Sequence, residues 1–149
     1  MKKTKQIKTH LEYLGYNVVR HEENKDILFC TRPGYTSIMV TVNDVRAEFY
    51  GMYDINRIGK SNHNQVLSYV NDLNASSFVV TFYHKDDILN MYANYVGKYE
   101  QSNFTSFISV LENDLNDRLA DMPDTQMFLG NPDKVDYSLQ ENYSSGALA

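Results

Sequence analysis

The sequence predicts an α+β domain in which a mostly antiparallel sheet carries helices on one face. Three observations predict it. Runs in which every second residue is apolar occur in two groups, over residues 17–52 and 77–96. Apolar stripes at helical spacing occur before, between and after these groups. Strands gathered in runs between helices are typical of α+β folds, so the expected order is α-β-β-β-β-α-β-β-α.

The first helix is expected over residues 4–14. Ile7, Leu11 and Leu14 recur at spacings of four and three, which places them on one stripe of a helix. Gly15 follows, at the position where a left-handed residue often closes a helix. The lysines near residue 2 lie at the helix end that disfavours positive charge, so we expect this end to fray.

Four short strands follow the first helix, and they are expected to form an antiparallel sheet with one solvated face. In the third, Ile38, Val40 and Val42 face the core. In the second, Ile27 and Phe29 point away from Leu28 and Cys30. The expected strands cover 17–22, 26–31, 36–42 and 45–52.

A helix and a hairpin form the central unit, residues 61–96. We expect a loop over 53–60, a helix capped by Ser61, and an end of the helix at Asn74, a residue that tolerates the left-handed conformation. The apolar stripe of this helix is formed by Val66, Tyr69, Val70 and Leu73. The hairpin pairs 77–84 with 87–96 around Lys85-Asp86, and Phe78, Val80 and Phe82 share one face of its first strand.

The last helix is expected to begin near Ser102 and to end at Pro123. It has the clearest apolar stripe, formed by Phe104, Phe107, Ile108, Leu111, Leu115 and Leu119. Periodicity is lost afterwards, although Met127, Phe128 and Leu129 could dock on the body. The sequence therefore predicts a single α+β domain over residues 1–123 and an acidic, flexible tail over 124–149.

Composition indicates a soluble protein of a reducing compartment. Of 149 residues, 42% are hydrophobic and 22% are charged, which is ordinary for one compact domain. The single cysteine, Cys30, allows no intramolecular disulfide. No apolar run is long enough to span a bilayer, and the basic N-terminus lacks the apolar segment of a signal peptide. We therefore expect a cytoplasmic protein with no membrane partner.

The charge is uneven along the chain. Residues 112–149 carry eight acidic and two basic side chains, a net charge of −6, so the first 111 residues carry +1 within a total of −5. Such an asymmetry can mark an interaction tail, but a solvated helix face followed by a disordered end is the interpretation we favour.

No constellation of reactive residues is visible. No two of the four histidines are closer than eleven residues, and one cysteine cannot form a paired metal motif. Asp86 and Asp87 are adjacent, so they would point to opposite faces of a strand. Phosphate-binding and nucleophile motifs are absent. We expect no catalytic residue, no metal and no cofactor, and the lysines near residue 2 indicate nucleic-acid binding only weakly because no RNA-binding motif accompanies them.

Tyrosine is the unusual feature of the composition, with twelve tyrosines and no tryptophan. Some of those that fall on or beside the expected strands should lie on the face opposite the core, and the set is Tyr50, Tyr53, Tyr83, Tyr92 and Tyr99. Tyrosine suits binding surfaces because it offers contact area at a low entropic cost. Strands also favour tyrosine for their own stability, and both readings stay open at this stage.

The central unit resembles the YbjN-like family, whose members share the fold of type III secretion chaperones. The segment 66–96 (VLSYVNDLNASSFVVTFYHKDDILNMYANYV) places Asn71-Asp72-Leu73-Asn74 at the end of a helix, directly before a hairpin. The N-terminal part of the chain also resembles the start of the family's sequences, at Leu14, Gly15, Tyr16, Ile27 and Phe29. The resemblance covers residues 4–122.

The resemblance implies a non-enzymatic protein that binds a partner polypeptide and forms a homodimer, as a chaperone or a regulator. The partner contacts expected from it and from the tyrosines are Tyr50, Tyr83 and Tyr92, together with Val66, Tyr69, Val70 and Leu73 if their helix forms the dimer face. The alternative is an inhibitor, for example a phage-encoded takeover factor, that blocks a host protein through its acidic C-terminal region. A hydrolytic or nucleotide-using enzyme is the third hypothesis.

Overall fold

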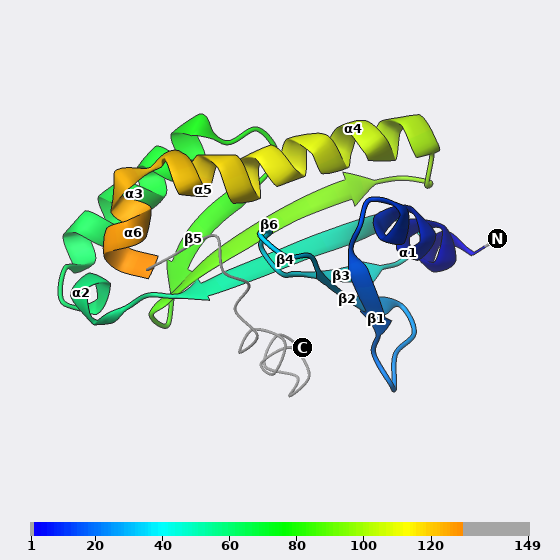
Figure 1. Ribbon diagram of the computed structural model, residues 1–149, viewed down its shortest axis with the longest axis horizontal. Coiled ribbons are helices and arrows are strands. Elements are labelled where there is room, and N and C mark those ends of the chain that lie inside the picture. Colours follow the sequence, from blue (N-terminus) through cyan, green and yellow to red (C-terminus); the bar gives the residue numbers. More distant parts are fainter. Residues whose placement is uncertain (1, 130–149) are drawn as a thin grey trace.

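The computed structural model describes residues 2–129, and it contains one six-stranded antiparallel sheet with helices over one face (Figure 1). The strand order is β1-β2-β3-β4-β6-β5. The strands are β1 (Asn17–Arg20), β2 (Ile27–Thr31), β3 (Ile38–Val42), β4 (Arg46–Asp54), β5 (Thr81–Lys85) and β6 (Ile88–Val96). The helices are α1 (Lys3–Tyr13), α2 (Arg57–Lys60), α3 (His63–Ser76), α4 (Gln101–Glu112), the π-helical η1 (Asn113–Asp117), α5 (Arg118–Asp121) and α6 (Pro123–Leu129).

The centre of the sheet is the long pair β4 and β6. Their nine residues run in register from Arg46 opposite Val96 to Asp54 opposite Ile88. The β5–β6 hairpin turns at Asp86 and Asp87, one residue later than expected, and both have positive φ angles. Two successive left-handed residues suit a tight hairpin because their twist matches that of the strands.

The main core lies between the sheet and the helices. Among its largest fully buried side chains are Phe49 from β4, Leu73 from α3 and Phe104 from α4. The alternation read from the strands holds here, since Ile38, Val40 and the other inward residues belong to this cluster. The α+β class, the antiparallel sheet and the single helix-covered face are thus confirmed (Figure 1).

A short helix, α2, occupies part of the segment that was expected to be a loop. The Asn56 side chain accepts a hydrogen bond from the Gly59 N–H (3.0 Å) and so caps this single turn. A Cβ on Gly59 would lie 2.4 Å from Ile55 Cγ2, closer than side chains approach. The turn therefore depends on a glycine whose role was not visible from periodicity.

The caps predicted for two helices were wrong. The residue before α3 is Asn62 rather than Ser61, and α3 continues past Asn74 to Ser76. The cap of α4 is Glu100 rather than Ser102, because the Glu100 carboxylate accepts from the Ser102 and Asn103 N–H groups. Asn74 does not end its helix because its amide bonds to the neighbouring strand instead.

Packed structure continues beyond Pro123, which begins α6 instead of ending the chain's helices. Proline fits the first position of a helix, where its missing N–H costs nothing. Phe128 is buried in the main core, and the hydroxyl of Tyr69 lies 2.6 Å from Thr125 Oγ1. The expected flexible tail is therefore helical as far as Leu129, and its remaining residues, 130–149, lie outside the described residues.

None of the helices in the described part of the chain combines the length and the apolar character that crossing a membrane requires.

Candidate functional site

A row of large side chains crosses the helix-free face of the sheet from one edge to the other. The strand register places Phe29 opposite Met39, Met39 opposite Tyr50, and Tyr50 opposite Tyr92. Residues opposite each other in antiparallel strands point to the same face, so the row is continuous. In strand order its members are Val19, Phe29, Met39, Tyr50, Tyr92 and Thr81.

The middle of this row forms a second apolar cluster, separate from the main core. Its buried members are Phe29, Met39 and Met52, and Ile27, Tyr50 and Ile88 pack against them. All of these residues lie in strands, and within residues 2–129 no helical residue belongs to the cluster. Both faces of the central strands are therefore apolar, which is unusual for an antiparallel sheet that packs helices on one side.

Tyr50, which packs against this cluster, forms a polar aromatic pair with its neighbour in the row, Tyr92. Their ring centroids are 5.2 Å apart with an interplanar angle of 53°. Both hydroxyls reach the same carboxylate oxygen: Tyr50 donates to Glu48 Oε2, and the Tyr92 hydroxyl lies 3.1 Å from it. Burial and the Glu48 carboxylate raise the pKa of Tyr50. The pair is held in place before any partner arrives, which lowers the entropic cost of binding.

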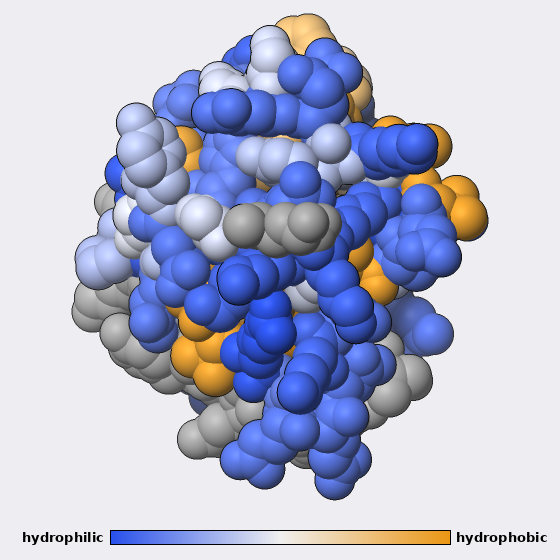
Figure 2. Space-filling view, turned by 90° about the vertical axis from the view of Figure 1, so that its right-hand side faces the viewer, coloured by the Kyte–Doolittle hydropathy of each residue, from blue (hydrophilic) through white to orange (hydrophobic). Residues whose placement is uncertain are grey.

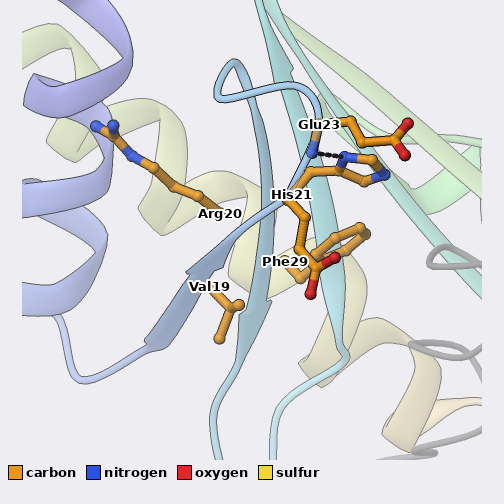
Figure 3. Close-up of a pocket in the computed structure, with 6 residues that line it drawn as sticks. Val19, Arg20, His21, Glu23 and Phe29 are labelled. Atoms are coloured by element: carbon orange, nitrogen blue, oxygen red, sulfur yellow. Dashed lines mark hydrogen bonds between the residues drawn. The ribbon is translucent and has the colours of Figure 1, made fainter.

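A pocket of about 350 Å³ lies at the β1 end of the row, on the β1–β2 hairpin (Figure 3). Val19 and Phe29 form its apolar side, and Glu22 and Glu23 are among its polar residues. His21 Nδ1 accepts from the N–H groups of Glu23 (3.1 Å) and Asn24 (3.2 Å). The proton of a neutral imidazole must therefore be on Nε2, which is left to act as a donor.

The β5 edge of the sheet is closed by side chains. The Asn74 amide accepts from the Phe82 N–H and donates to the Phe82 carbonyl, both at 2.8 Å, as a neighbouring strand would. One oxygen of the buried Asp114 accepts from the N–H groups of residues 78, 79 and 80, at 2.9, 2.7 and 3.0 Å. An added strand would have to displace these bonds, so this edge is protected against pairing.

The opposite edge, β1, has no strand beside it among residues 2–129. The His21 N–H bonds to the Ile27 carbonyl, which makes 21 and 27 a hydrogen-bonded pair. Hydrogen-bonded and non-bonded pairs alternate along an antiparallel ladder. The backbone groups of Val18 and Arg20 therefore point away from β2, toward the outer side of the sheet.

The sequence-predicted contact residues separate into two groups. Tyr50, Tyr92 and Tyr83 lie together on the helix-free face, where Tyr83 is opposite Asn90 and is 42% exposed. The other four residues, Val66, Tyr69, Val70 and Leu73, are buried in the main core. Phe78 differs from its expected companions Val80 and Phe82, since they are buried while it is exposed.

Sequence reasoning missed Phe29, Met39 and Met52 as parts of the site. Phe29 was separated from Leu28 and Cys30 without a choice of which side faces the core, and Met39 and Met52 were not considered. The available signal was the run Ile27–Cys30, in which four successive residues are apolar. Such a run is typical of a strand that is buried on both faces.

Cys30 and the pair His63 and His84 are two places among residues 2–129 where reactive side chains can be examined. Cys30 is fully buried, and its burial raises the pKa of the thiol, which opposes formation of the nucleophilic thiolate. His63 and His84 do meet, with ring centroids 5.4 Å apart. Within the described residues, however, no three His, Cys, Asp or Glu side chains are placed to hold a metal ion.

A second pocket, of about 450 Å³, separates α1 from the start of α4. At its base, His10 Nδ1 lies 2.8 Å from the Tyr99 hydroxyl and Nε2 lies 3.3 Å from Thr105 Oγ1. Burial lowers the pKa of His10, so the neutral ring that joins these two partners is favoured. This end of the molecule is mainly hydrophilic, with apolar areas that are small and separate (Figure 2). It offers no broad apolar surface to a partner.

Comparison with known proteins gives one kind of match. No protein-family model matches the sequence, and no curated protein matches it. The crystal structure of YbjN from E. coli, a candidate transcription regulator, superposes with a TM-score of 0.63. The alignment covers 84% of this chain and 93% of that chain. The chain has a YbjN-like fold.

At 16% sequence identity, this likeness concerns the fold alone. It confirms the resemblance seen in the segment 66–96 and in the order of the elements. A shared fold does not transfer a function, because functions depend on sites that differ between proteins of one fold. The YbjN-like fold is compatible with a regulatory or binding module, and the assignment of a function must rest on the surfaces of this chain.

Proposed function

We propose that this protein is a non-enzymatic binding module that holds a segment of a partner polypeptide on the helix-free face of its sheet. The proposal is carried by one observation, the row of six side chains that crosses all six strands at this face. The contact residues are Tyr50, Tyr83 and Tyr92, with Phe29 and Met39 between β1 and the tyrosines.

The dimensions of the row favour a polypeptide over a small molecule. Strands in a sheet are spaced by about 4.8 Å, so six strands extend over roughly 24 Å. An extended chain of about seven residues has this length. Tyrosine and methionine are also enriched at protein interfaces. A nucleic acid is a poor alternative, since the chain has a net charge of −5 and the row ends near Glu22 and Glu23.

The role that we assign is that of a chaperone-like or regulatory adaptor. It agrees with the YbjN-like fold, whose E. coli example is a candidate transcription regulator. We extend the proposal to a homodimer in the cytoplasm, where the free thiol of Cys30 would remain reduced. The protected β5 edge means that partner binding by strand addition would use β1.

The test is capture of partners from a lysate of the native source, with the affinity tag at the N-terminus. The variant Tyr50→Ser/Tyr92→Ser removes the aromatic pair, and Tyr13→Ser, at an 87% exposed position on α1, is the matched control. A stoichiometric partner that is retained by the control and lost by the double variant supports the proposal. Retention by both variants would refute the assigned face, and the absence of any partner would refute the function.

The inhibitor hypothesis requires a separate variant. Deleting residues 124–149 would remove the buried Phe128 and damage the core, so it cannot report on charge alone. Full-length Asp133→Asn/Asp136→Asn/Glu141→Gln spares α6 and removes only carboxylates. Loss of the partner in this variant would favour an acidic-region inhibitor, whereas retention agrees with binding at the helix-free face.

A further inference from the structure

Four cationic side chains meet at a pocket between the start of α1 and the β1–β2 hairpin. The pocket has a volume of about 440 Å³ and is lined by Lys2, Thr4, Lys5, Arg20, Lys25 and Asp26. Its lining contains four cations and one carboxylate, a local charge of +3 in a chain whose net charge is −5. Positive charge is therefore gathered here against the overall balance of the molecule.

The pocket is formed by two segments that the fold fixes against each other. One is the first turn of α1, and the other is the end of β1 with the turn that follows it, residues 20–26. Thr4 Oγ1 donates to Asp26 Oδ1 at 2.6 Å, and Lys3 Nζ donates to the Asn43 carbonyl at 3.0 Å. The walls are thus held in place before a ligand arrives, which lowers the entropic cost of binding.

The four cations of the lining are not neutralised within residues 2–129. The ion pairs in this part of the chain take their positive charge from Lys8, Arg32, Arg46 and His84, none of which lines the pocket. The carboxylate of Asp26 is engaged by Thr4 through one oxygen. A cleft that is lined by unpaired charges of one sign concentrates ions of the opposite sign. The pocket therefore attracts anions.

Arg20 gives the pocket its most specific recognition group. Strand alternation points its side chain away from that of Val19, and Figure 3 shows it extending toward α1, away from Glu23. Its Nε is shielded from solvent and has no hydrogen-bond partner among residues 2–129. A buried donor without an acceptor costs free energy. A guanidinium matches the oxygens of a phosphate with two parallel hydrogen bonds, so such a ligand would supply the missing acceptors.

The first turn of α1 adds to the attraction for an anion. Its cap residue, Lys2, makes no side-chain cap bond and no acidic residue lies in the turn, whereas Asn56 and Glu100 cap α2 and α4. Lysines at the positive end of a helix dipole are unfavourable by themselves. A bound anion would offset their charge and accept from the free N–H groups of the turn. A local conflict of this kind is typical of functional sites.

We propose that this pocket binds the phosphate group of a small phosphorylated ligand, with a diphosphate favoured over a monophosphate. A diphosphate offers more charge and more acceptor oxygens to the four cations. The volume lies in the range of small-molecule sites. A nucleic-acid strand requires instead a long basic groove that follows its backbone. Arg20 lies opposite Leu28 of the main core, so the pocket is separate from the helix-free face and the inference does not depend on the proposed function.

Calorimetric titration of the full chain with inorganic pyrophosphate, and separately with adenosine diphosphate, tests the proposal at low ionic strength. Sulfate and a single-stranded RNA oligonucleotide are titrated in parallel. Lys5→Gln/Lys25→Gln removes two charges of the lining at exposed positions. Lys60→Gln/Lys98→Gln removes two exposed lysines outside the lining and is the matched control, because it changes the net charge equally. Thermal unfolding without ligand checks that both variants are folded.

The proposal expects saturable binding of both diphosphates, weakened about tenfold or more by Lys5→Gln/Lys25→Gln and changed less than about twofold by the control. Arg20→Lys keeps the charge but loses the paired donors, so it should weaken binding several-fold. Failure of both diphosphates to bind would overturn the proposal. Sulfate that binds as tightly as pyrophosphate, or equal weakening by the two double variants, would also overturn it, because general charge would then explain the binding. Binding of the RNA alone would overturn it in favour of a nucleic-acid surface.

Amide chemical shifts locate the bound anion in the same full-length protein. Titration with pyrophosphate should move the amide resonances of Thr4, Arg20 and Lys25, which belong to the two walls of the pocket. The amide of Tyr83 in β5, at the opposite edge of the sheet, is the internal reference and should stay in place. Binding that moves other amides and leaves these three unchanged would refute the assignment of this pocket.

Discussion

The two faces of the sheet are apolar for different reasons. On the helix-covered face, Phe49 and Met91 pack against side chains from α3, α4 and α6 in one continuous core. On the other face, Tyr50 and Met52 belong to a second cluster whose members within residues 2–129 all lie in strands, and the tyrosine hydroxyls are held by Glu48. Phe49 and Tyr50 are neighbours in β4, so one strand displays both environments.

This difference separates a face that makes the fold from a face that is free to serve a function. Residues of the covered face have long-range partners in several elements, so their removal leaves cavities between rigid layers. Residues of the helix-free face have partners within the sheet, so substitutions there should leave the domain folded. Function-altering variants are therefore best sought on the helix-free face, and stability-altering variants on the covered face.

The largest effect is expected from Phe49→Ala. Removing a fully buried aromatic ring should lower the free energy of unfolding by about 3–5 kcal/mol. The adjacent Tyr50→Ala should cost about 1–2 kcal/mol, since its ring is only partly buried. Urea denaturation of both variants measures the two losses. Equal losses would break the distinction between the faces.

Two carboxylates allow the next comparison. Asp114 is fully buried and accepts three backbone N–H bonds, so Asp114→Ala should cost roughly 2–4 kcal/mol by leaving buried donors unpaired. Glu48 lies on the partly solvated face, and Glu48→Ala should cost about 1 kcal/mol or less. Chemical denaturation at neutral pH gives both values. A larger loss for Glu48→Ala than for Asp114→Ala would contradict this account.

Alkaline pH should weaken the covered side of the fold. Burial raises the pKa of Tyr16 and Tyr69, and Glu112 raises that of Tyr16 further. Above pH about 10 the unfolded chain loses these protons while the folded chain keeps them, so the free energy of unfolding falls as pH rises. The slope approaches about 1.4 kcal/mol per pH unit for each group.

Thermal or urea unfolding between pH 8 and 11 measures this slope. Tyr16→Phe/Tyr69→Phe should flatten the decrease, because phenylalanine has no proton to lose. The decrease in the free energy of unfolding with pH that remains in the double variant should come in part from Tyr50, whose pKa is also raised by burial and by Glu48. If the double variant loses stability as steeply as the parent chain, the burial of these hydroxyls does not control the alkaline limit.

The smallest effect is expected from Tyr92→Phe. The substitution removes one hydroxyl, while Glu48 keeps its bond from Tyr50, so the stability loss should be about 0.5 kcal/mol. Tyr69→Phe, which removes a buried hydroxyl from its bond to Thr125, should cost more, about 1 kcal/mol. The two variants can be compared by the midpoints of their urea transitions. A larger loss for Tyr92→Phe than for Tyr69→Phe would show that the pair of Tyr50 and Tyr92 serves mainly to stabilise the fold.

Much of the architecture was visible from periodicity. The stripe Ile7, Leu11 and Leu14 and the alternation around Val40 each need one fixed spacing, and spacing is a local property. The positions of α2 and α6 were not visible in this way. The first depends on the close approach of Gly59 to Ile55, and the second on the burial of Phe128 beside Tyr69, which involves segments far apart in the chain.

Local sequence patterns were sufficient to predict the α+β class, the antiparallel sheet and the side of the sheet on which Tyr50, Tyr83 and Tyr92 lie. They could not show that these tyrosines continue a row with Phe29 and Met39, because that row runs across strands and exists only once their register is set. Only the tertiary structure decided this, and it also decided that Asn74 and Asp114 close one edge of the sheet. Both outcomes depend on contacts between residues distant in sequence, which local patterns do not encode.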